Sequence, residues 1–234
     1  YKILRNVVDL NFDDNEEYCK NLSQKEYRKL LLKAQEHLQR ETSTLKIARA
    51  IINDLKEYSG ENKLHVQSSL YLRGSRPVSD SVNPSSESIG WHREYFYGQG
   101  MENAINIWIP IRGVTSKNAL RFIPESQNIP NKEIKISQYS DPYTSQFSTG
   151  HKLGFQYSPK KIVSGVDLSR AMAFPCTNRQ FVMFSGNLVH GSAINLSEKI
   201  RFSIDFRVIP SRFAALTKQE HYASENKPYF EEID

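Results

Sequence analysis

The residues with the clearest chemical potential are two histidines and one glutamate. His92 and Glu94 stand two positions apart in the segment WHREYFYG, residues 91–98. Side chains alternate between faces along an extended strand, so these two are expected to point the same way and to bind one ion. His190, in the distant segment LVHGS, residues 188–192, would add a third ligand. The sequence therefore predicts a metal site made of two imidazoles and one carboxylate.

This set of ligands suggests a particular chemistry. Two imidazoles and a carboxylate on one side of an iron ion leave the opposite side open for a co-substrate and O₂, as in non-haem Fe(II) oxygenases. The short motif alone is weak evidence, because 6 histidines and 26 acidic residues give about 0.7 His-x-acid pairs by chance. The alternative is a surface histidine beside a solvated glutamate. The aromatic surroundings of His92 favour the metal site. Only His92 among the six histidines is followed by an acid two residues later, which favours it further.

Arg201 and Ser203 indicate what would bind beside such an iron. An oxygenase of this kind needs two further electrons to reduce O₂, and a 2-oxo acid supplies them by losing CO₂. The acid chelates through its 2-oxo and C1-carboxylate groups and leaves a second carboxylate deeper in the barrel, where a guanidinium can bind it through two charge-assisted hydrogen bonds. Arg201 follows His190 after a turn, and Ser203 shares its strand face. The alternative is an ordinary strand arginine paired with Asp205 or a neighbouring acid.

These motifs resemble those of a known family. HRE at 92–94, HGS at 190–192 and RFS at 201–203 are similar to the motifs of the Fe(II)/2-oxoglutarate-dependent dioxygenases, and within them of the phytanoyl-CoA dioxygenase superfamily. The resemblance extends over about 64–210. WHREYFYG followed by INIWIP at 105–110 also resembles the antibiotic-biosynthesis branch, including the streptomycin-cluster dioxygenases. The implied fold is the double-stranded β-helix, and the implied cofactors are Fe(II) and 2-oxoglutarate.

The resemblance also implies roles for individual residues. The iron ligands would be His92, Glu94 and His190, and Arg201 would hold the distal carboxylate of 2-oxoglutarate. Further contacts to the co-substrate are expected from Ser203, Ser192, Trp108 and Asn106. Most relatives have Asp where this chain has Glu94, and members that halogenate carry a small residue there, so a carboxylate argues against halogenation.

Three residues near the predicted ligands are candidates for substrate binding: Tyr95, Tyr97 and Arg73. For the two tyrosines the alternative is core packing. For Arg73 it is a surface salt bridge. Arg93 is expected to point away from its two neighbours and to be structural.

Two helices are expected before the strands. Ser23 and Glu26 form a capping-box pattern, and apolar residues follow at helical spacing up to Leu38. A second helix is expected from Thr44 to Ser59, ending at Gly60. The apolar piece at 3–10 is expected to be an edge strand or a loop.

From residue 64 the pattern changes to short β-rich segments separated by Pro, Gly, Ser and Asn. Strands are expected at 64–73, 89–97, 104–111, 120–124, 180–184, 188–194 and 200–208. In 105–111 and 200–208 apolar residues alternate with polar or functional ones, so each strand should have one apolar and one functional face. The predicted fold class is α+β, with a jelly-roll or cupin-like core whose first sheet is braced by the N-terminal helices and whose mouth holds the site.

The 234 residues are expected to form a single oxygenase domain. It would consist of a helical part at 1–63, a β core at 64–210 and a C-terminal extension at 211–234. The polar stretch at 125–178 is interpreted as an insertion that serves as a lid or substrate loop.

The composition limits the kinds of partner and the cellular location that we expect for the protein. The net charge is +5, but the basic residues are scattered, which does not favour a nucleic-acid-binding surface. Cys19 and Cys176 form no CxxC pair, so neither a disulfide framework nor a zinc cluster is predicted. No apolar run approaches the roughly 20 residues of a membrane span. No secretory signal is visible and the cytoplasm is the expected location, although a chain that begins at Tyr1 is compatible with a missing N-terminal segment.

The expected partners are therefore O₂ and a small polar substrate. Hydroxylation of a C–H bond in a sugar, aminoglycoside or amino-acid-derived metabolite is the simplest prediction. Desaturation, ring closure or epimerisation would need the same residues and depends on how the substrate lies. A cupin-like isomerase or binding module that holds a metal without redox chemistry is the alternative from another class.

Overall fold

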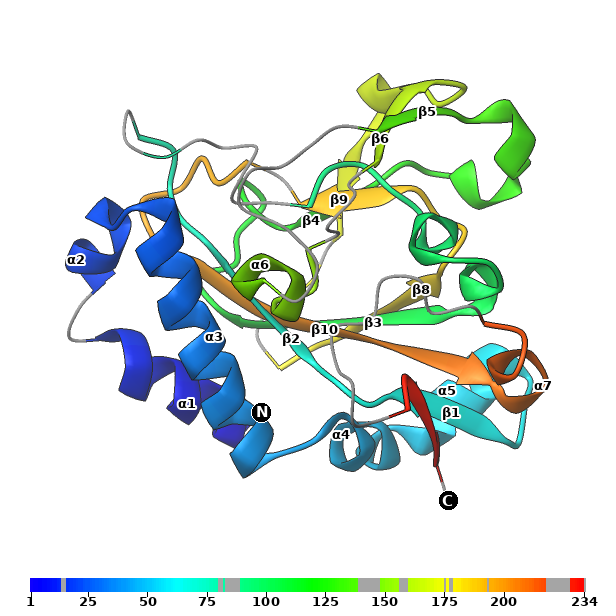
Figure 1. Cartoon of the computed structure of the whole chain (residues 1–234), viewed down its shortest axis with the longest axis horizontal. Helices are drawn as coiled ribbons and strands as arrows, with labels where there is room; N and C mark the ends of the chain where they lie inside the picture. Colours follow the sequence, from blue (N-terminus) through cyan, green and yellow to red (C-terminus); the bar gives the residue numbers. More distant parts are fainter. Residues whose placement is uncertain are drawn as a thin grey trace.

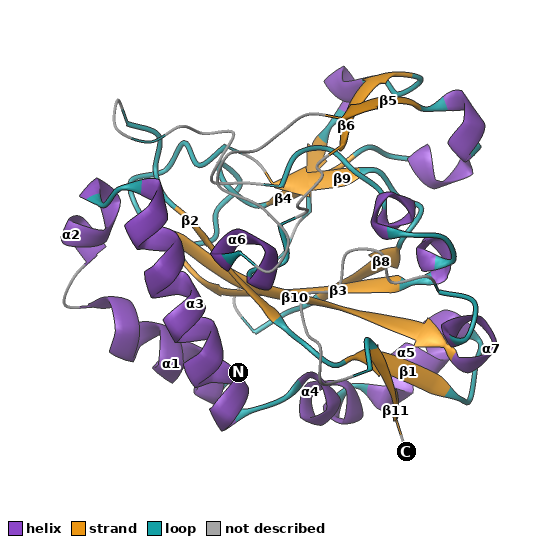
Figure 2. Cartoon of the chain, viewed as in Figure 1, coloured by secondary structure: helices purple, strands orange, loops and turns teal. Residues whose placement is uncertain are grey.

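The structure is a computed structural model that describes residues 1–13, 16–79, 82, 89–138, 148–155, 160–174, 176, 179–192, 194–217 and 228–233. Helices and strands are both present, and the strands form antiparallel sheets (Figures 1 and 2). The α+β class with a jelly-roll type of core is thereby confirmed, with helices on one face of the larger sheet.

Among the described residues, five helices precede the first strand: α1 (Lys2–Phe12), α2 (Glu16–Asn21), α3 (Gln24–Glu41), α4 (Thr44–Ala50) and α5 (Ile52–Ser59). The expectation of a strand or loop at 3–10 is wrong, because α1 covers this segment. Its buried residues Leu4, Val7, Val8 and Phe12 follow helical spacing and lie on one face of α1.

The capping box that was predicted before α3 is present. The Ser23 hydroxyl accepts from the Glu26 backbone N–H, and the Glu26 carboxylate accepts from the Ser23 backbone N–H. The single helix expected at 44–59 is divided at Ile51, whose backbone (φ −123°, ψ 22°) is not helical. The predicted end at Gly60 is confirmed, since this residue adopts the left-handed conformation that glycine favours.

The larger sheet has the strand order β11-β1-β10-β3-β8, and β2 also pairs with β10. Its strands are β1 (Leu64–Gln67), β2 (Tyr71–Ser75), β3 (Ile105–Arg112), β8 (Val182–Ser185), β10 (Arg201–Pro210) and β11 (Phe230–Ile233). The strand expected at 64–73 is thus two strands. The C-terminal extension is partly ordered, because β11 pairs with β1 at one edge.

A smaller sheet has the order β7-β4-β9, with β4 (Leu120–Phe122), β7 (Met172–Ala173) and β9 (His190–Ser192). A separate hairpin is formed by β5 (Lys135–Gln138) and β6 (Lys160–Ser164). The insertion at 125–178 therefore contributes regular structure, including one strand of the smaller sheet, and 139–147 and 156–159 lie outside the described residues.

The remaining helical elements are short. They are η3 (Glu94–Tyr97), η4 (Met101–Asn103), η5 (Ser126–Asn128), η6 (Asn131–Glu133), α6 (Thr149–Lys152), η7 (Leu168–Arg170) and α7 (Ser211–Ala214). The strand expected at 89–97 is therefore wrong: His92 forms an isolated bridge with His190, and a 3₁₀ turn begins at Glu94.

Strand β10 has the two faces that its sequence predicted. Phe202, Phe206 and other apolar residues of β10 are fully buried in the core that α1 and α3 share with the sheet (Figure 1). Helix α3 approaches β2 so closely that a Cβ at Gly74 would lie 2.5 Å from the Tyr27 hydroxyl, which explains the glycine. The opposite face of β10 carries polar side chains and looks toward the smaller sheet.

Strand β3 departs from strict alternation at its end. The register between β3 and β10 shifts between Phe202 and Ser203, so that Phe202 is opposite Arg112. Arg112 therefore lies on the helix side, where it forms ion pairs with Asp9 and Asp13 near α1. In the part of the chain that is described, no helix is long and apolar enough to cross a membrane.

Candidate metal centre

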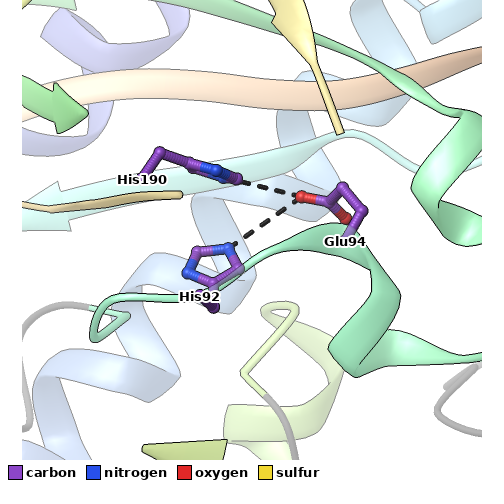
Figure 3. A group of neighbouring side chains, drawn as sticks. All are labelled: His92, Glu94 and His190. Carbon is purple, nitrogen blue, oxygen red and sulfur yellow. Dashed lines mark ion pairs between the residues drawn. The ribbon is translucent and has the colours of Figure 1, made fainter. Parts of the chain in front are cut away.

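His92, Glu94 and His190 come together although they stand on three different elements (Figure 3). One potential ligand atom from each residue lies within 4.8 Å of the others, and all three side chains are buried. Glu94 Oε1 is 3.9 Å from His92 Nε2 and 3.5 Å from His190 Nε2. These are the atoms that a bound ion would share.

The backbone holds this arrangement. His92 N donates to the His190 carbonyl at 2.9 Å, and His190 N donates back to His92 at 3.0 Å. Arg93 is extended (φ −123°, ψ 160°), which places the side chains before and after it on a common side although no long strand is present. Glu94 N donates to the carbonyl of Gly186, in the turn between β8 and β9. The three ligand candidates are thus tied to one another and to the β8–β9 turn.

Hydrogen bonds orient both imidazoles. His92 Nδ1 lies 2.7 Å from the Gly90 carbonyl and His190 Nδ1 lies 2.9 Å from the Leu188 carbonyl. A carbonyl only accepts, so each Nδ1 carries the proton and each Nε2 keeps its lone pair. Burial lowers the pKa of both imidazoles, that of His92 well below its usual value, and the neighbouring His190 lowers it further. Both rings are therefore neutral at pH 7, as metal ligands must be.

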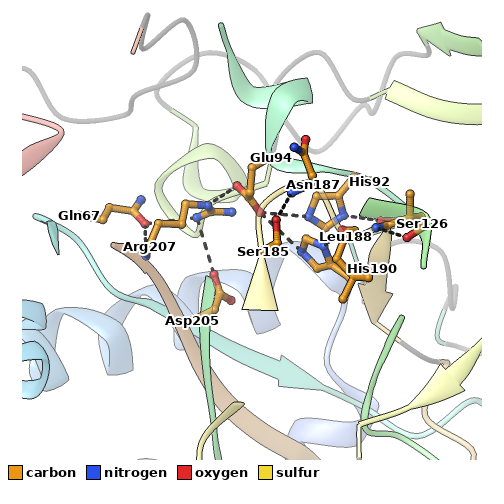
Figure 4. Close-up of polar contacts among 12 residues, drawn as sticks. Gln67, His92, Glu94, Ser126, Ser185, Asn187, Leu188, His190, Asp205 and Arg207 are labelled. Atoms are coloured by element: carbon orange, nitrogen blue, oxygen red, sulfur yellow. Dashed lines mark hydrogen bonds and ion pairs between the residues drawn. The ribbon is translucent and has the colours of Figure 1, made fainter. Parts of the chain in front are cut away.

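Glu94 is also paired on its other side. Its second oxygen, Oε2, accepts a hydrogen bond from Arg207 Nε, whereas Oε1 has no hydrogen-bond partner among the described residues (Figure 4). Although burial acts to lower it, the Glu94 carboxylate holds the pKa of Arg207 well above its usual value. The two oxygens of one carboxylate thus have different surroundings.

A cavity that opens to solvent lies beside the two histidines, between the larger and the smaller sheet. It is lined by Arg73, Ile89, His92, Asn106, Ile107, Trp108, Leu120, Phe184, His190, Asp205 and Arg207. Besides His92 and His190, the predicted site residues that line the cavity are Trp108, Asn106 and Arg73.

Arg73 does not form a surface salt bridge. It donates to both oxygens of Asp205, at 2.5 and 3.1 Å, and its side chain is buried. Burial acts to raise the pKa of Asp205, but the Arg73 guanidinium outweighs it and holds this pKa below the usual range. Asp205 therefore pairs mainly with Arg73, and Arg207 Nη1 lies 3.9 Å from its Oδ1 (Figure 4).

Arg201 lacks such an acid. It is 1% exposed, and Nη1 donates to the Asn118 carbonyl at 3.0 Å, but it forms no ion pair with any described residue. The alternative in which Arg201 pairs with Asp205 is wrong, because Arg73 takes that carboxylate. Burial lowers the pKa of Arg201 to about 10, so it remains charged at pH 7.

Buried donors near the site that have no hydrogen-bond partner within the described part of the chain include Arg201 Nε, Ser203 Oγ, Asn106 Nδ2 and the Tyr97 hydroxyl. Arg201 and Ser203 share the face of β10 that carries Asp205 and Arg207, although they do not themselves line the cavity. An unpaired buried cation and hydroxyl are costly. They fit a ligand that brings a carboxylate.

The remaining predicted residues lie as follows. Tyr97 is buried, with its ring 5.6 Å from that of His92, whereas Tyr95 is 41% exposed and is not brought to the cavity. The Ser192 backbone pairs with Leu120, but its side chain lies outside the described residues. Arg93 is buried and donates to the carbonyls of Ile129 and Ser126 and to Asn131 Oδ1, a structural role as expected.

Sequence reasoning assigned no role to Arg207, Gln67 or Gly186. The alternation of β10 placed Arg207 on the same face as Arg201, which was the available signal. Nothing in the sequence indicated that Arg207 would meet Glu94, 113 residues away.

The fold and the buried His–Glu–His group define a jelly-roll type of protein with a site that could hold a metal ion. The chain belongs to the phytanoyl-CoA dioxygenase (PhyH) family, whose model matches residues 10–203. No curated protein matches the sequence.

Several solved structures are similar at low identity. The apo form of the non-heme monooxygenase ThoJ matches with a TM-score of 0.47 and 17% identity over 70% of this chain and 52% of ThoJ. The epimerase SnoN, in complex with Fe3+, alpha ketoglutarate and nogalamycin RO, matches with a TM-score of 0.44 and 12% identity over 73% of this chain and 62% of SnoN. EvdO2 from Micromonospora carbonacea var. aurantiaca, complexed with 2-oxoglutarate, matches with a TM-score of 0.42 and 14% identity over 71% and 57%. The chain spans about half the length of ThoJ.

Proposed function

We propose that the protein is an Fe(II)- and 2-oxoglutarate-dependent oxygenase. His92, Glu94 and His190 would hold the iron, with the two Nε2 atoms and Glu94 Oε1 as ligands. The observation that carries the proposal is Arg201, a buried guanidinium without an acidic partner among the described residues, on the polar face of β10. A dicarboxylic co-substrate would supply the missing anion.

In this proposal each residue has a defined task. Arg201 binds the distal carboxylate of 2-oxoglutarate through charge-assisted hydrogen bonds, and the Ser203 hydroxyl donates another. Asn106 and Trp108 border the space between the ligands and β10. When bound, iron and 2-oxoglutarate would supply the redox chemistry: 2-oxoglutarate gives electrons to O₂, and the activated oxygen oxidises a C–H bond. The protein orients the reactants and excludes water.

For the reaction itself we propose hydroxylation of a small polar metabolite, such as a sugar, an aminoglycoside or an amino-acid derivative. The support is the polar wall of the cavity, where Arg73, Asp205 and Asn106 offer both donors and acceptors. Desaturation, ring closure or epimerisation would use the same iron site, because the position of the substrate C–H bond decides the outcome.

Anaerobic titration of the Fe(II) protein with 2-oxoglutarate tests the proposal. Chelation is expected to produce the weak visible metal-to-ligand charge-transfer band. Arg201→Ala should keep the iron but require far more 2-oxoglutarate for the same band. Iron binding without any band in the folded wild-type protein would refute the proposal and favour a cupin-like protein that binds metal without redox chemistry.

A further inference from the structure

Contacts with neighbouring side chains fix the position of Arg207. Its backbone N and its Nη1 both donate to Gln67 Oε1, at 3.1 and 3.3 Å, and its guanidinium carbon lies 4.8 Å from the centre of the Tyr97 ring. Gln67 is fully buried and is itself fixed by donating to the Tyr229 hydroxyl. The guanidinium therefore has a defined position before any metal binds.

From that position Arg207 contacts only one of the two Glu94 oxygens. Nε donates to Oε2, and Oε1 is left facing the two Nε2 atoms at 3.9 and 3.5 Å (Figure 4). A glutamate has one methylene more than an aspartate and more rotamers to lose when it is ordered. Without a partner for Oε2, the carboxylate could rotate or offer both oxygens to the ion.

The methylene groups of Glu94 are confined from the other side by Gly186. A Cβ built on Gly186 would lie 3.1 Å from Glu94 Cγ and 2.8 Å from the Ala104 carbonyl oxygen. The absence of a side chain at this position leaves the space that the longer acid needs. Gly186 thus leaves room for the methylene groups of Glu94, and Arg207 fixes its carboxylate.

We propose that Arg207 is the positioning residue that makes Glu94 a one-oxygen metal ligand. It occupies Oε2 and so directs Oε1 toward the ion, in the way that hydrogen-bonded partners commonly orient metal-binding carboxylates. The inference rests on the proposed function for the identity of the ion, but it concerns metal binding and not the reaction.

A purely structural ion pair makes a different prediction. If Arg207 only neutralised Glu94, its removal would leave an uncompensated carboxylate beside two neutral imidazoles, and cation affinity would rise. If Arg207 positions the carboxylate, cation affinity falls even though a positive charge has been removed from the site. The sign of the change therefore separates the two roles.

The experiment measures binding of Mn(II) alone to the full chain by titration calorimetry, together with the d–d absorption spectrum of the Co(II)-loaded protein. Arg207→Gln is expected to bind Mn(II) about 10- to 100-fold more weakly than wild type. Its Co(II) spectrum should change because the ligand geometry changes. Arg207→Lys, which keeps the charge but lacks the planar fork, should show an intermediate loss of at least about fivefold.

Arg201→Gln is the matched control, because Arg201 is a buried arginine on the same face of β10 that does not contact Glu94. It should bind Mn(II) like wild type, with an unchanged Co(II) spectrum. Equal or tighter Mn(II) binding by folded Arg207→Gln would overturn the proposal. If Arg207→Gln does not fold, folded Arg207→Lys decides, and wild-type affinity with an unchanged spectrum overturns the proposal as well.

The two proposals fail in different ways. If iron-loaded wild type shows no charge-transfer band with 2-oxoglutarate, the proposed function is refuted. The Mn(II) comparison between wild type and the Arg207 variants would still be valid. Unchanged Mn(II) binding in the Arg207 variants, with a normal band in wild type, would refute the positioning role alone.

Discussion

Replacing Arg201 with methionine should separate a binding residue from a structural one. In the ligand-free protein Arg201 Nε has no partner in the described structure, and Nη1 has one, the Asn118 carbonyl. Losing that bond costs about 1.5–3 kcal/mol, and removing the unpaired buried donor returns about 1–3 kcal/mol. The two terms offset, so the free energy of unfolding of metal-free Arg201→Met should stay within about 1 kcal/mol of wild type.

The same substitution should have a large effect on 2-oxoglutarate. Two hydrogen bonds from a guanidinium to a carboxylate are worth about 1.5–3 kcal/mol each, and 1.36 kcal/mol corresponds to a tenfold change in affinity. Binding of 2-oxoglutarate to the iron-loaded variant should therefore be at least about a hundredfold weaker. Saturating 2-oxoglutarate should stabilise wild type by about 2.7 kcal/mol at 100 times its Kd, and should stabilise Arg201→Met by no more than about 0.4 kcal/mol at that concentration.

Arg93→Met provides the matched control. Arg93 is equally buried, at 1% exposure, and its pKa is also lowered to about 10 by burial, but it donates to Ile129, Ser126 and Asn131. Loss of these bonds should destabilise the protein by about 3–5 kcal/mol. Urea denaturation with and without iron and 2-oxoglutarate measures both effects. Equal destabilisation by Arg201→Met and Arg93→Met, or unchanged 2-oxoglutarate binding in Arg201→Met, would refute the reasoning.

Three further results are expected. His190→Ala should lose iron on gel filtration while keeping the circular dichroism of wild type, because one of three ligands is gone; full iron retention would contradict its assignment. Gly186→Ala should lower the free energy of unfolding by about 1–3 kcal/mol, since its Cβ would meet backbone oxygens at 2.8 and 3.0 Å, whereas Gly90→Ala, whose Cβ meets nothing within 4 Å, should not. Metal-free protein should lose stability as pH falls below about 6.5, by up to about 1.4 kcal/mol per pH unit for each of His92 and His190, because the unfolded chain takes up protons that the buried imidazoles do not. Urea denaturation between pH 5 and 7.5 measures this slope, and a double variant with glutamine at both positions should flatten it.

Much of the fold was predictable because local patterns match the final structure. The capping box at Ser23, the left-handed stop at Gly60 and the alternation of β10 each depend on a few neighbouring residues. The helical spacing of α1 is also present in the sequence, so the prediction of a strand or loop there missed a local pattern. The break at Ile51 was not predictable in this way, since helical apolar spacing continues through it.

The candidate site was predicted in part. The motif around His92 and the histidine at 190 were identified, and they do come together. Strand alternation does not fully explain the first pair, because only Arg93 is extended and Glu94 begins a 3₁₀ turn. The position of Arg201 after His190 predicts its role, but only the tertiary structure excludes the alternative of a pair with Asp205.

By itself, the sequence determined which chemical groups are available and which of them share a strand face, because the alternation of side chains is a local property of the backbone. Only the tertiary structure decided how the charges on that face are paired. Asp205 forms an ion pair with Arg73, 132 residues away, and Glu94 forms an ion pair with Arg207, 113 residues away. Partner choice among buried charges depends on which strands lie side by side, and that choice leaves Arg201 without an acid among the described residues and Glu94 with one oxygen toward the histidines.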